Sequence, residues 1–266
     1  SCSPTQWIKF YDIDMDGRPD IVITDQGVGN VFIFGNKSAN GLIDFPTSAR
    51  QVIATSAGSL VGLDVADFDG DNKPEIICNS DKASMFLLPN ESAAGTIKMG
   101  IPKTISIPGS NLVNLKVGDL DNDGDKDIAV SNLVNNIFVL VNNGDKDNYN
   151  FSSPKYIETG RAPWGLDIGD LNGDGLPDIL VATTDASDKL TALINTSSGS
   201  TLSYIPYNIG NADVSFNVVI SDMNGDAKPD VGYVNRNAAN NELVFLRNSH
   251  CVLANILPED PPAVCS

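Results

Sequence analysis

A nine-residue, aspartate-rich loop occurs five times in this 266-residue chain, roughly every 52 residues. An acid or amide side chain occupies positions 1, 3, 5 and 9 of every loop. The loops open at Asp12, Asp67, Asp119, Asp170 and Asp222. A tightly curled loop of this kind gathers oxygen atoms around one point, and Ca²⁺ prefers about six to eight oxygen ligands. The pattern therefore predicts a repeat protein that binds about five calcium ions.

The candidate ligands are the side chains at positions 1, 3, 5 and 9 and the backbone carbonyl at position 7. The side-chain candidates are Asp12, Asp14, Asp16 and Asp20; Asp67, Asp69, Asp71 and Glu75; Asp119, Asp121, Asp123 and Asp127; Asp170, Asn172, Asp174 and Asp178; and Asp222, Asn224, Asp226 and Asp230. The carbonyl candidates are Arg18, Lys73, Asp125, Leu176 and Lys228. Proline at position 8 of four loops is expected to fix φ so that position 9 returns to the metal.

Position 6 is where the chain must turn sharply. Gly17, Gly124 and Gly175 suit this position because glycine tolerates positive φ, and Asn72 is the next best choice. Ala227 fits poorly, so the fifth loop is the weakest of the five candidate sites.

An EF-hand opens with the same pattern, but the residues after the loop exclude it. An EF-hand has a bidentate glutamate at position 12. Here that position holds an apolar residue, a cysteine or a tyrosine, within short β-rich runs such as 21–23 and 179–181. The second and fourth residues before each opening aspartate are also apolar, which is the period-two alternation of a strand. Each loop is therefore predicted to join two β-strands.

Further strands are predicted after each loop. The third strands are expected at 31–34, 85–88, 137–141, 190–194 and 243–246, each just before Asn36, Asn90, Asn142, Asn195 or Asn248. The fourth are expected at 51–53, 104–107, 156–158 and 203–207. Repeats of about 40 to 50 residues with four short strands are typical of propeller blades. We predict an all-β fold, a β-propeller of about five four-stranded blades with a calcium loop between the first and second strand of each.

The predicted domain organisation is a single propeller over residues 1–250, with blades starting near residues 5, 60, 112, 163 and 215. Residues 251–266 are interpreted as a closing strand, within 251–257, and a proline-rich linker to a further domain. Alternatively, N-terminal residues complete the fifth blade, or the propeller continues in a longer chain. An unclosed edge would favour self-association through sheet edges.

These D-x-D-x-D-G-x-x-D loops between strands resemble the FG-GAP/VCBS repeats of integrin α-subunit propellers and of many secreted bacterial proteins. The resemblance covers roughly residues 5–250. It implies a calcium-loaded propeller used for adhesion or ligand recognition outside the cell. Integrin propellers have seven blades, only some of which carry calcium, whereas all five repeats of this chain carry a loop. The family also includes propellers attached to enzymes.

The charge of the chain is concentrated in the loops. There are 34 acidic and 17 basic residues, and 18 of the acids occupy ligand positions. Five Ca²⁺ ions would bring the formal charge from −17 to −7, so folding and calcium binding are expected to be coupled. The acidic balance argues against nucleic acid and anionic membrane as partners. No apolar run approaches the ~20 residues that span a bilayer, so no membrane insertion is expected.

The four cysteines allow three full pairings. Cys78 lies in a predicted strand and is interpreted as a buried free thiol. Either a local Cys251–Cys265 bridge or a closing Cys2–Cys251 bridge is expected, and four reduced thiols are the alternative. The chain opens at Ser1 without a signal peptide, which suggests a processed or excised segment.

Other singled-out residues have ordinary structural interpretations. Trp7 and Trp164 are expected to pack between blades rather than to stack on sugars. Carboxylates outside the loops are expected on a solvated face, and these are Asp25, Asp64, Asp167 and Asp185. Sequons begin at Asn36, Asn90, Asn150 and Asn195, three of them in predicted surface turns after third strands.

No catalytic centre is expected. His250 is the single histidine and lies beside Cys251 without a paired nucleophile arrangement, and the loop carboxylates are directed at cations. The sequence favours an adhesion or recognition module of a larger secreted or cell-surface protein, with a protein or glycan ligand. The alternative is a structural building block of a surface layer, fibre or secretion-associated assembly. A propeller domain of a polysaccharide-active enzyme is less favoured.

Overall fold

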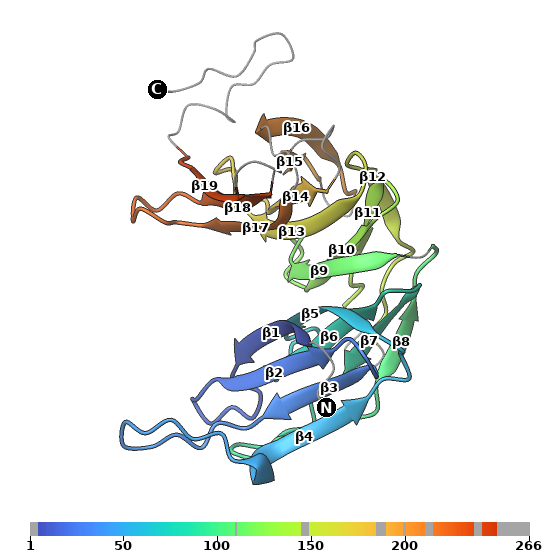
Figure 1. Cartoon of the computed structure of the whole chain (residues 1–266). Coiled ribbons are helices and arrows are strands. Elements are labelled where there is room, and N and C mark those ends of the chain that lie inside the picture. Colours follow the sequence, from blue (N-terminus) through green and yellow to red (C-terminus); the bar gives the residue numbers. More distant parts are fainter. Residues whose placement is uncertain are drawn as a thin grey trace. The chain divides into compact units, whose positions relative to one another are not determined.

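The computed structural model describes residues 5–109, 111–144, 149–184, 190–198, 201–210, 215–236 and 241–248 (Figure 1). In this part of the chain, nineteen strands form five antiparallel sheets, four with four strands and one with three. The sheets are consistent with propeller blades, and the predicted all-β class is confirmed. No helix in the described part of the chain has the length and apolarity needed to cross a lipid bilayer.

Each sheet is built from consecutive strands. The first sheet contains β1 (Thr5–Tyr11), β2 (Asp20–Asp25), β3 (Asn30–Phe34) and β4 (Arg50–Ala54), with the short 3-10 helix η1 (Thr47–Ala49) before β4. The second contains β5 (Leu60–Ala66), β6 (Glu75–Ser80), β7 (Ser84–Leu88) and β8 (Lys103–Ser106). The third contains β9 (Leu112–Gly118), β10 (Asp127–Asn132), β11 (Asn136–Leu140) and β12 (Lys155–Glu158). The fourth contains β13 (Pro163–Gly169), β14 (Asp178–Thr183), β15 (Leu190–Asn195) and β16 (Tyr204–Gly210). The fifth contains β17 (Ser215–Ser221), β18 (Asp230–Arg236) and β19 (Asn241–Leu246).

The chain divides into two compact units, and the division passes through the third sheet. Unit 1 comprises Ser1–Val117, Asp125–Val130 and Leu140–Pro154. Unit 2 comprises Gly118–Gly124, Ser131–Val139 and Lys155–Ser266. A single propeller over 1–250 stays a prediction. The expected closing strand within 251–257 lies outside the described residues.

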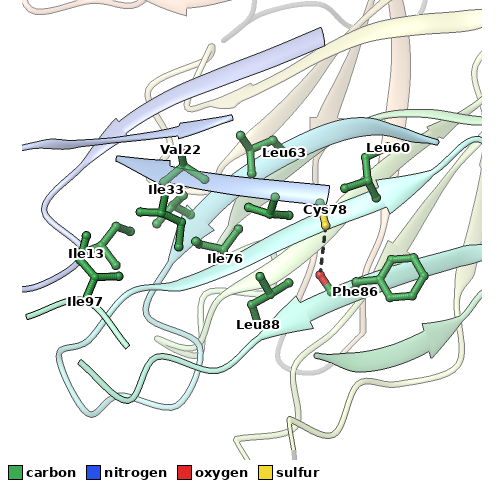
Figure 2. Packing of buried hydrophobic residues seen from close by; sticks show 12 residues of the cluster. Ile13, Val22, Ile33, Leu60, Leu63, Ile76, Cys78, Phe86, Leu88 and Ile97 are labelled. Carbon is green, nitrogen blue, oxygen red and sulfur yellow. Dashed lines mark hydrogen bonds between the residues drawn. The ribbon is translucent and has the colours of Figure 1, made fainter. Parts of the chain in front are cut away.

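The core of unit 1 is an apolar cluster contributed by the first two sheets and their loops (Figure 2). The second strand β6 is covered on both faces and buries all six of its residues, of which Ile76, Ile77 and Cys78 are apolar. Cys78 on β6 is a buried free thiol, as predicted, and its Sγ lies 3.6 Å from the carbonyl oxygen of Phe86. Burial raises the pKa of this thiol far above its ordinary value. Cys2, Cys251 and Cys265 lie outside the described residues.

The two tryptophans pack within their units, as expected. Trp7 is partly buried against the unit 1 core, and its Nε1 donates to the carbonyl oxygen of Val61. In unit 2, the rings of Trp164 and Phe216 meet edge to face with centroids 5.2 Å apart. These contacts join neighbouring sheets through their first strands, β1 to β5 and β13 to β17.

The expectation that carboxylates outside the loops are solvated was wrong for Asp64 and Asp25, which are buried, while Asp167 is half-buried. Asp64 is 9 % exposed, and its two oxygens bind the ammonium of Lys9 at 2.7 Å and the backbone N–H of Val117 at 3.1 Å. In unit 2, Asp167 accepts the N–H of Ile220 at 2.8 Å. These carboxylates link the first strands of consecutive sheets. Asp25 is also buried, and it accepts the N–H of Gly27 at 2.6 Å, while Asp185 lies outside the described residues.

Candidate metal centres

The five loops, numbered 1 to 5 in chain order, each join the first and second strand of a sheet. The aspartate at position 1 closes the turn. In loop 1, Asp12 accepts the N–H of Asp16 at 3.0 Å and the N–H of Gly17 at 2.8 Å, one with each carboxylate oxygen. The bond from position 6 to position 1 recurs in the other four loops at 2.9 to 3.0 Å. These hydrogen bonds to the position-1 aspartate therefore hold the loop in its turn without a cation.

Position 6 has a positive φ in every loop, and this includes Ala227, whose φ is 65°. Loop 5 therefore forms the same turn as the others, with an alanine held in the left-handed region that glycine prefers, as expected of a poor fit at this position. Position 4 is a second left-handed position that the sequence reasoning missed. Its residues are Met15, Gly70, Asn122, Gly173 and Gly225. Three of these five residues are glycines, and this preference could have predicted a left-handed conformation at position 4.

Three groups of acidic side chains come together, with one oxygen of each within 4.8 Å of the others. They are Asp12, Asp14 and Asp20 in loop 1; Asp67, Asp69 and Asp71 in loop 2; and Asp119, Asp121 and Asp127 in loop 3. Within the described residues, loops 4 and 5 form no such group of three acids, because position 3 is an asparagine. These amides bind carboxylates of their own loops: Asn172 Nδ2 lies 2.8 Å from Asp174 Oδ2, and Asn224 Nδ2 lies 3.0 Å from Asp230 Oδ2.

The position-9 carboxylate fastens the loop to the residue after the third strand. Asp20 accepts the N–H of Ile13 at 2.9 Å with one oxygen and that of Asn36 at 2.8 Å with the other. The equivalent pair of bonds is made by Glu75, Asp178 and Asp230. Position 9 therefore has a structural role in addition to its predicted role as a ligand.

Burial raises the pKa of three of the position-9 acids, Asp20, Glu75 and Asp178, despite the hydrogen bonds that favour their charged form. The pKa of Glu75 is raised to about 7 and that of Asp178 to about 6, and the pKa of Asp20 is raised as well. The nearby aspartates of each loop add to this effect, because like charges disfavour ionisation. A cation in the loop would offset both causes.

The remaining predicted ligands lie at the same loops. Position 5 carboxylates accept the N–H of position 7, as in Asp71 and Lys73 at 2.8 Å, and the same bond recurs in loops 1, 4 and 5. In loop 1, Asp16 also pairs with the guanidinium of Arg18. The position 7 carbonyls stay predicted ligands, and these belong to Arg18, Lys73, Asp125, Leu176 and Lys228.

The residues of loops 1 and 3 fit a bound Ca²⁺. Asp14 is fully buried, and its Oδ1 atom has no hydrogen-bond partner. The Oδ1 atom of Asp121 is buried without a partner in the same way. Buried carboxylate oxygens are costly unless they are paired or bind a cation. The donors are oxygens of carboxylates and amides, which suit calcium rather than a softer metal.

The asparagines after the third strands were expected in surface turns, and this was wrong. Asn36, Asn90 and Asn195 are 8 %, 5 % and 0 % exposed, and their side-chain amides donate to backbone carbonyls. A glycan on any of these nitrogens would break those bonds. Asn150, by contrast, is exposed.

A family model described as FG-GAP-like repeat matches residues 12–78, 119–181 and 170–233. The chain belongs to the FG-GAP-like repeat family. Each FG-GAP-like match starts at the opening aspartate of a loop, and each ends within the strand that comes after the next loop. Each match to the FG-GAP-like repeat thus spans two successive loops. The family is the one that the loop sequences resemble.

Comparison with other proteins adds little to the family assignment. No curated protein matches the sequence. Among solved structures, a chain of the Tc holotoxin pore of Photorhabdus luminescens is similar, with a TM-score of 0.41 and 11 % identity. The match covers 93 % of this FG-GAP-like chain and 14 % of the toxin chain. This likeness is too distant to carry a conclusion about fold or function.

Proposed function

We propose that this FG-GAP-like chain is an extracellular module that binds about five Ca²⁺ ions and recognises a protein or glycan ligand. The observation that carries the calcium assignment is the Oδ1 atom of Asp14. It is buried, it has no partner, and it belongs to a group of three carboxylates drawn together by the loop. A cation is the simplest group that satisfies such an oxygen.

In each loop, the ion would be held by the side chains at positions 1, 3, 5 and 9 and by the carbonyl at position 7. When bound, Ca²⁺ supplies two positive charges that neutralise the crowded carboxylates. It would also tie position 3 to position 9, and therefore the end of one strand to the start of the next. The role is structural, because the loops stiffen the turns of the sheets.

An extracellular or cell-surface location is consistent with the same chemistry. Extracellular calcium modules work with dissociation constants of about 10⁻⁴ to 10⁻³ M, and calcium at that level is found outside the cell. A chain with a formal charge of −17 and carboxylate clusters needs a constant supply of the ion. Neither nucleic acid nor direct membrane insertion is proposed for this acidic chain.

The recognition role is supported by membership in a repeat family used for adhesion. We propose no catalytic activity, because the loop carboxylates are held by backbone N–H groups. Asp12, for example, has both oxygens engaged by N–H groups of its own loop.

A structural role in an assembly is the second candidate, and exposed apolar residues favour it. Ile8 and Phe10 on β1 are 53 % and 61 % exposed. On β19, Leu243 and Phe245 are 63 % and 58 % exposed. Apolar residues grouped on a sheet in this way often mark contact surfaces. Self-association in calcium, measured by light scattering, would favour assembly, whereas binding of the monomeric module on a glycan array would favour recognition.

The calcium assignment is tested by removing one loop carboxylate. Asp123→Ala should remove one ion from the total counted by native mass spectrometry and lower the melting temperature in calcium. Asp44→Ala, an exposed acid outside the loops, is the matched control and should retain the full ion count. An unchanged metal stoichiometry in Asp123→Ala would contradict the assignment.

A further inference from the structure

We propose that the asparagine at the end of the third strand of a sheet, or just after it, couples calcium binding in two successive loops. The inference rests on the proposed function, since it requires that the loops bind Ca²⁺. It adds that neighbouring sites do not fill independently, and it assigns the coupling to one side chain.

In unit 1, Asn90 connects loop 1 with loop 2. Its Nδ2 donates to the carbonyl oxygen of Ile13, at position 2 of loop 1, at 2.9 Å. The same nitrogen donates to the carbonyl oxygen of Pro74, at position 8 of loop 2, also at 2.9 Å. The backbone N–H of Asn90 binds Glu75 Oε1, at position 9 of loop 2, at 3.4 Å. One buried residue therefore holds the residue before Asp14 of one loop and the closing carboxylate of the next.

The same arrangement recurs along the chain. In unit 2, Asn195 Nδ2 binds the carbonyl oxygens of Leu120 at 2.8 Å and Pro177 at 2.9 Å, and its N–H binds Asp178 at 2.7 Å. Asn248 repeats the three bonds with Leu171, Pro229 and Asp230, and Asn142 bonds with Phe68 and Asp127. Four such asparagines thus join successive loops, which argues for a recurrent connection rather than a single accidental contact.

A second contact reinforces the link in unit 1. The N–H of Gly95, a few residues after Asn90, donates to the backbone carbonyl of Asp14 at 3.0 Å. Ile97 packs in the same core cluster as Ile13, as Figure 2 shows. The segment that begins at Asn90 therefore covers the ligand-bearing turn of loop 1.

Loop 2 is covered in an equivalent way. The hydroxyl of Tyr149 donates to Asp69 Oδ2 at 3.0 Å, and the rings of Phe68 and Phe151 meet edge to face at 5.8 Å. Asp69, a candidate ligand of loop 2, is thus in contact with the segment that follows β11, the third strand of the next sheet. Loops 1 and 2 share this type of cover.

The expected coupling is positive because ordering is shared. Calcium in loop 2 fixes Glu75, and Glu75 fixes the backbone of Asn90. The amide of Asn90 then holds the turn of loop 1 in its binding conformation, so less conformational entropy is lost when loop 1 fills. Coupling between sites is reciprocal, and a typical value is about 5- to 150-fold in affinity.

The test is a calcium titration followed by NMR, with one amide reporter in each loop. The N–H groups of Gly17 and Asn72 report loops 1 and 2, because each donates to the position-1 aspartate of its loop. Asp71→Ala disables loop 2 and should raise the calcium midpoint at Gly17 by about fivefold or more. In the Asn90→Ala background, the same substitution should change that midpoint by less than about twofold. Asp44→Ala, an exposed acid outside the loops and outside the segment that begins at Asn90, is the control and should retain the coupling.

The outcomes separate the two proposals. If no loop amide responds to calcium, the proposed function fails. If the loops bind but Asp71→Ala leaves the Gly17 midpoint unchanged, or shifts it equally in the Asn90→Ala background, the coupling is overturned. If Asn90→Ala does not fold, the same cycle is measured on Asn195 with Asp174→Ala and the reporter Gly124.

Discussion

Loop 1 and loop 5 share one sequence pattern but differ in how much protein surrounds them. In loop 1, Ile13 at position 2 is fully buried and Asp14 at position 3 has no contact with solvent. In loop 5, Met223 at position 2 is 39 % exposed, and Asn224 is exposed as well. The backbone turn is the same in both, with the position-6 N–H bound to the position-1 aspartate.

The difference lies in the segments that pack over each loop. Loop 1 is covered by the segment that starts at Asn90, and its position-2 carbonyl accepts the amide of that residue. In the described part of the chain, no equivalent segment covers loop 5. The nine-residue pattern thus determines the turn, while the burial of the site depends on the next repeat. We expect the covered loop to contribute more to stability.

Removal of calcium should have the largest effect and should act mainly through the covered loop. An ion present at 100 times its dissociation constant adds about 2.7 kcal/mol, so several ions amount to a melting-temperature loss on the order of 20 °C in chelator. Calorimetry with and without calcium measures this loss. Asp16→Ala in loop 1 should lower the melting temperature in calcium by more than Asp226→Ala in loop 5. Equal losses would show that the covered loop contributes no more to stability than the exposed one.

The next largest effect is expected at position 2. Ile13→Ala should lower the free energy of unfolding by about 2 to 5 kcal/mol, because it leaves a cavity in a closed core. Met223→Ala should cost less than about 1 kcal/mol, since much of that side chain is in water. Urea unfolding in calcium compares the two variants. A similar loss for both would mean that loop 5 is as enclosed as loop 1.

The metal-free protein should lose stability as pH rises. The pKa of Glu75 is raised by burial to about 7, so its contribution is full below its ordinary pKa and is lost as pH rises through about 7. The free energy of unfolding in chelator should therefore fall by about 2 to 3 kcal/mol between pH 5 and pH 8. The pKa of Asp20 in loop 1 is also raised, so its contribution to stability should likewise fall as pH rises.

Loop 5 should show the opposite trend at Asp222. The pKa of that carboxyl is lowered chiefly by the N–H of Ala227, so its contribution is lost as pH falls through the lowered pKa. Denaturant unfolding across pH in chelator, and again in excess calcium, measures both trends. A metal-free stability that is constant from pH 5 to pH 8 would contradict the prediction for Glu75.

The smallest effect is expected from relief of backbone strain, and it should be similar in the two loops. Met15 at position 4 of loop 1 and Ala227 at position 6 of loop 5 have φ values of 55° and 65°. Replacing either by glycine should stabilise the protein by up to about 1 kcal/mol, because an L residue is disfavoured there. Gly17→Ala should destabilise it by a comparable amount. Melting temperatures in calcium check all three, and a destabilised Ala227→Gly would show that the alanine methyl makes a favourable contact.

The strands, their order and the positions of the loops could be predicted from the sequence. Period-two alternation before Asp12 and β-rich runs after Asp20 are local signals, and they correspond to β1 and β2. The oxygen-bearing positions recur at fixed spacing, so three carboxylate groups were also predictable. Local chemistry suffices for these features because the interacting residues lie within nine positions of one another.

The partners of the asparagines and of Asp64 could not be predicted, because they lie in other repeats. Ile13 and Asn90 are 77 positions apart, and Asp64 and Val117 are 53 apart. Nothing in a local pattern indicates which backbone group a side chain will meet at that distance. The sequence by itself therefore determined the repeating turn and its oxygen donors. Only the tertiary structure decided which turn is enclosed, because enclosure depends on the packing of the following sheet against the loop.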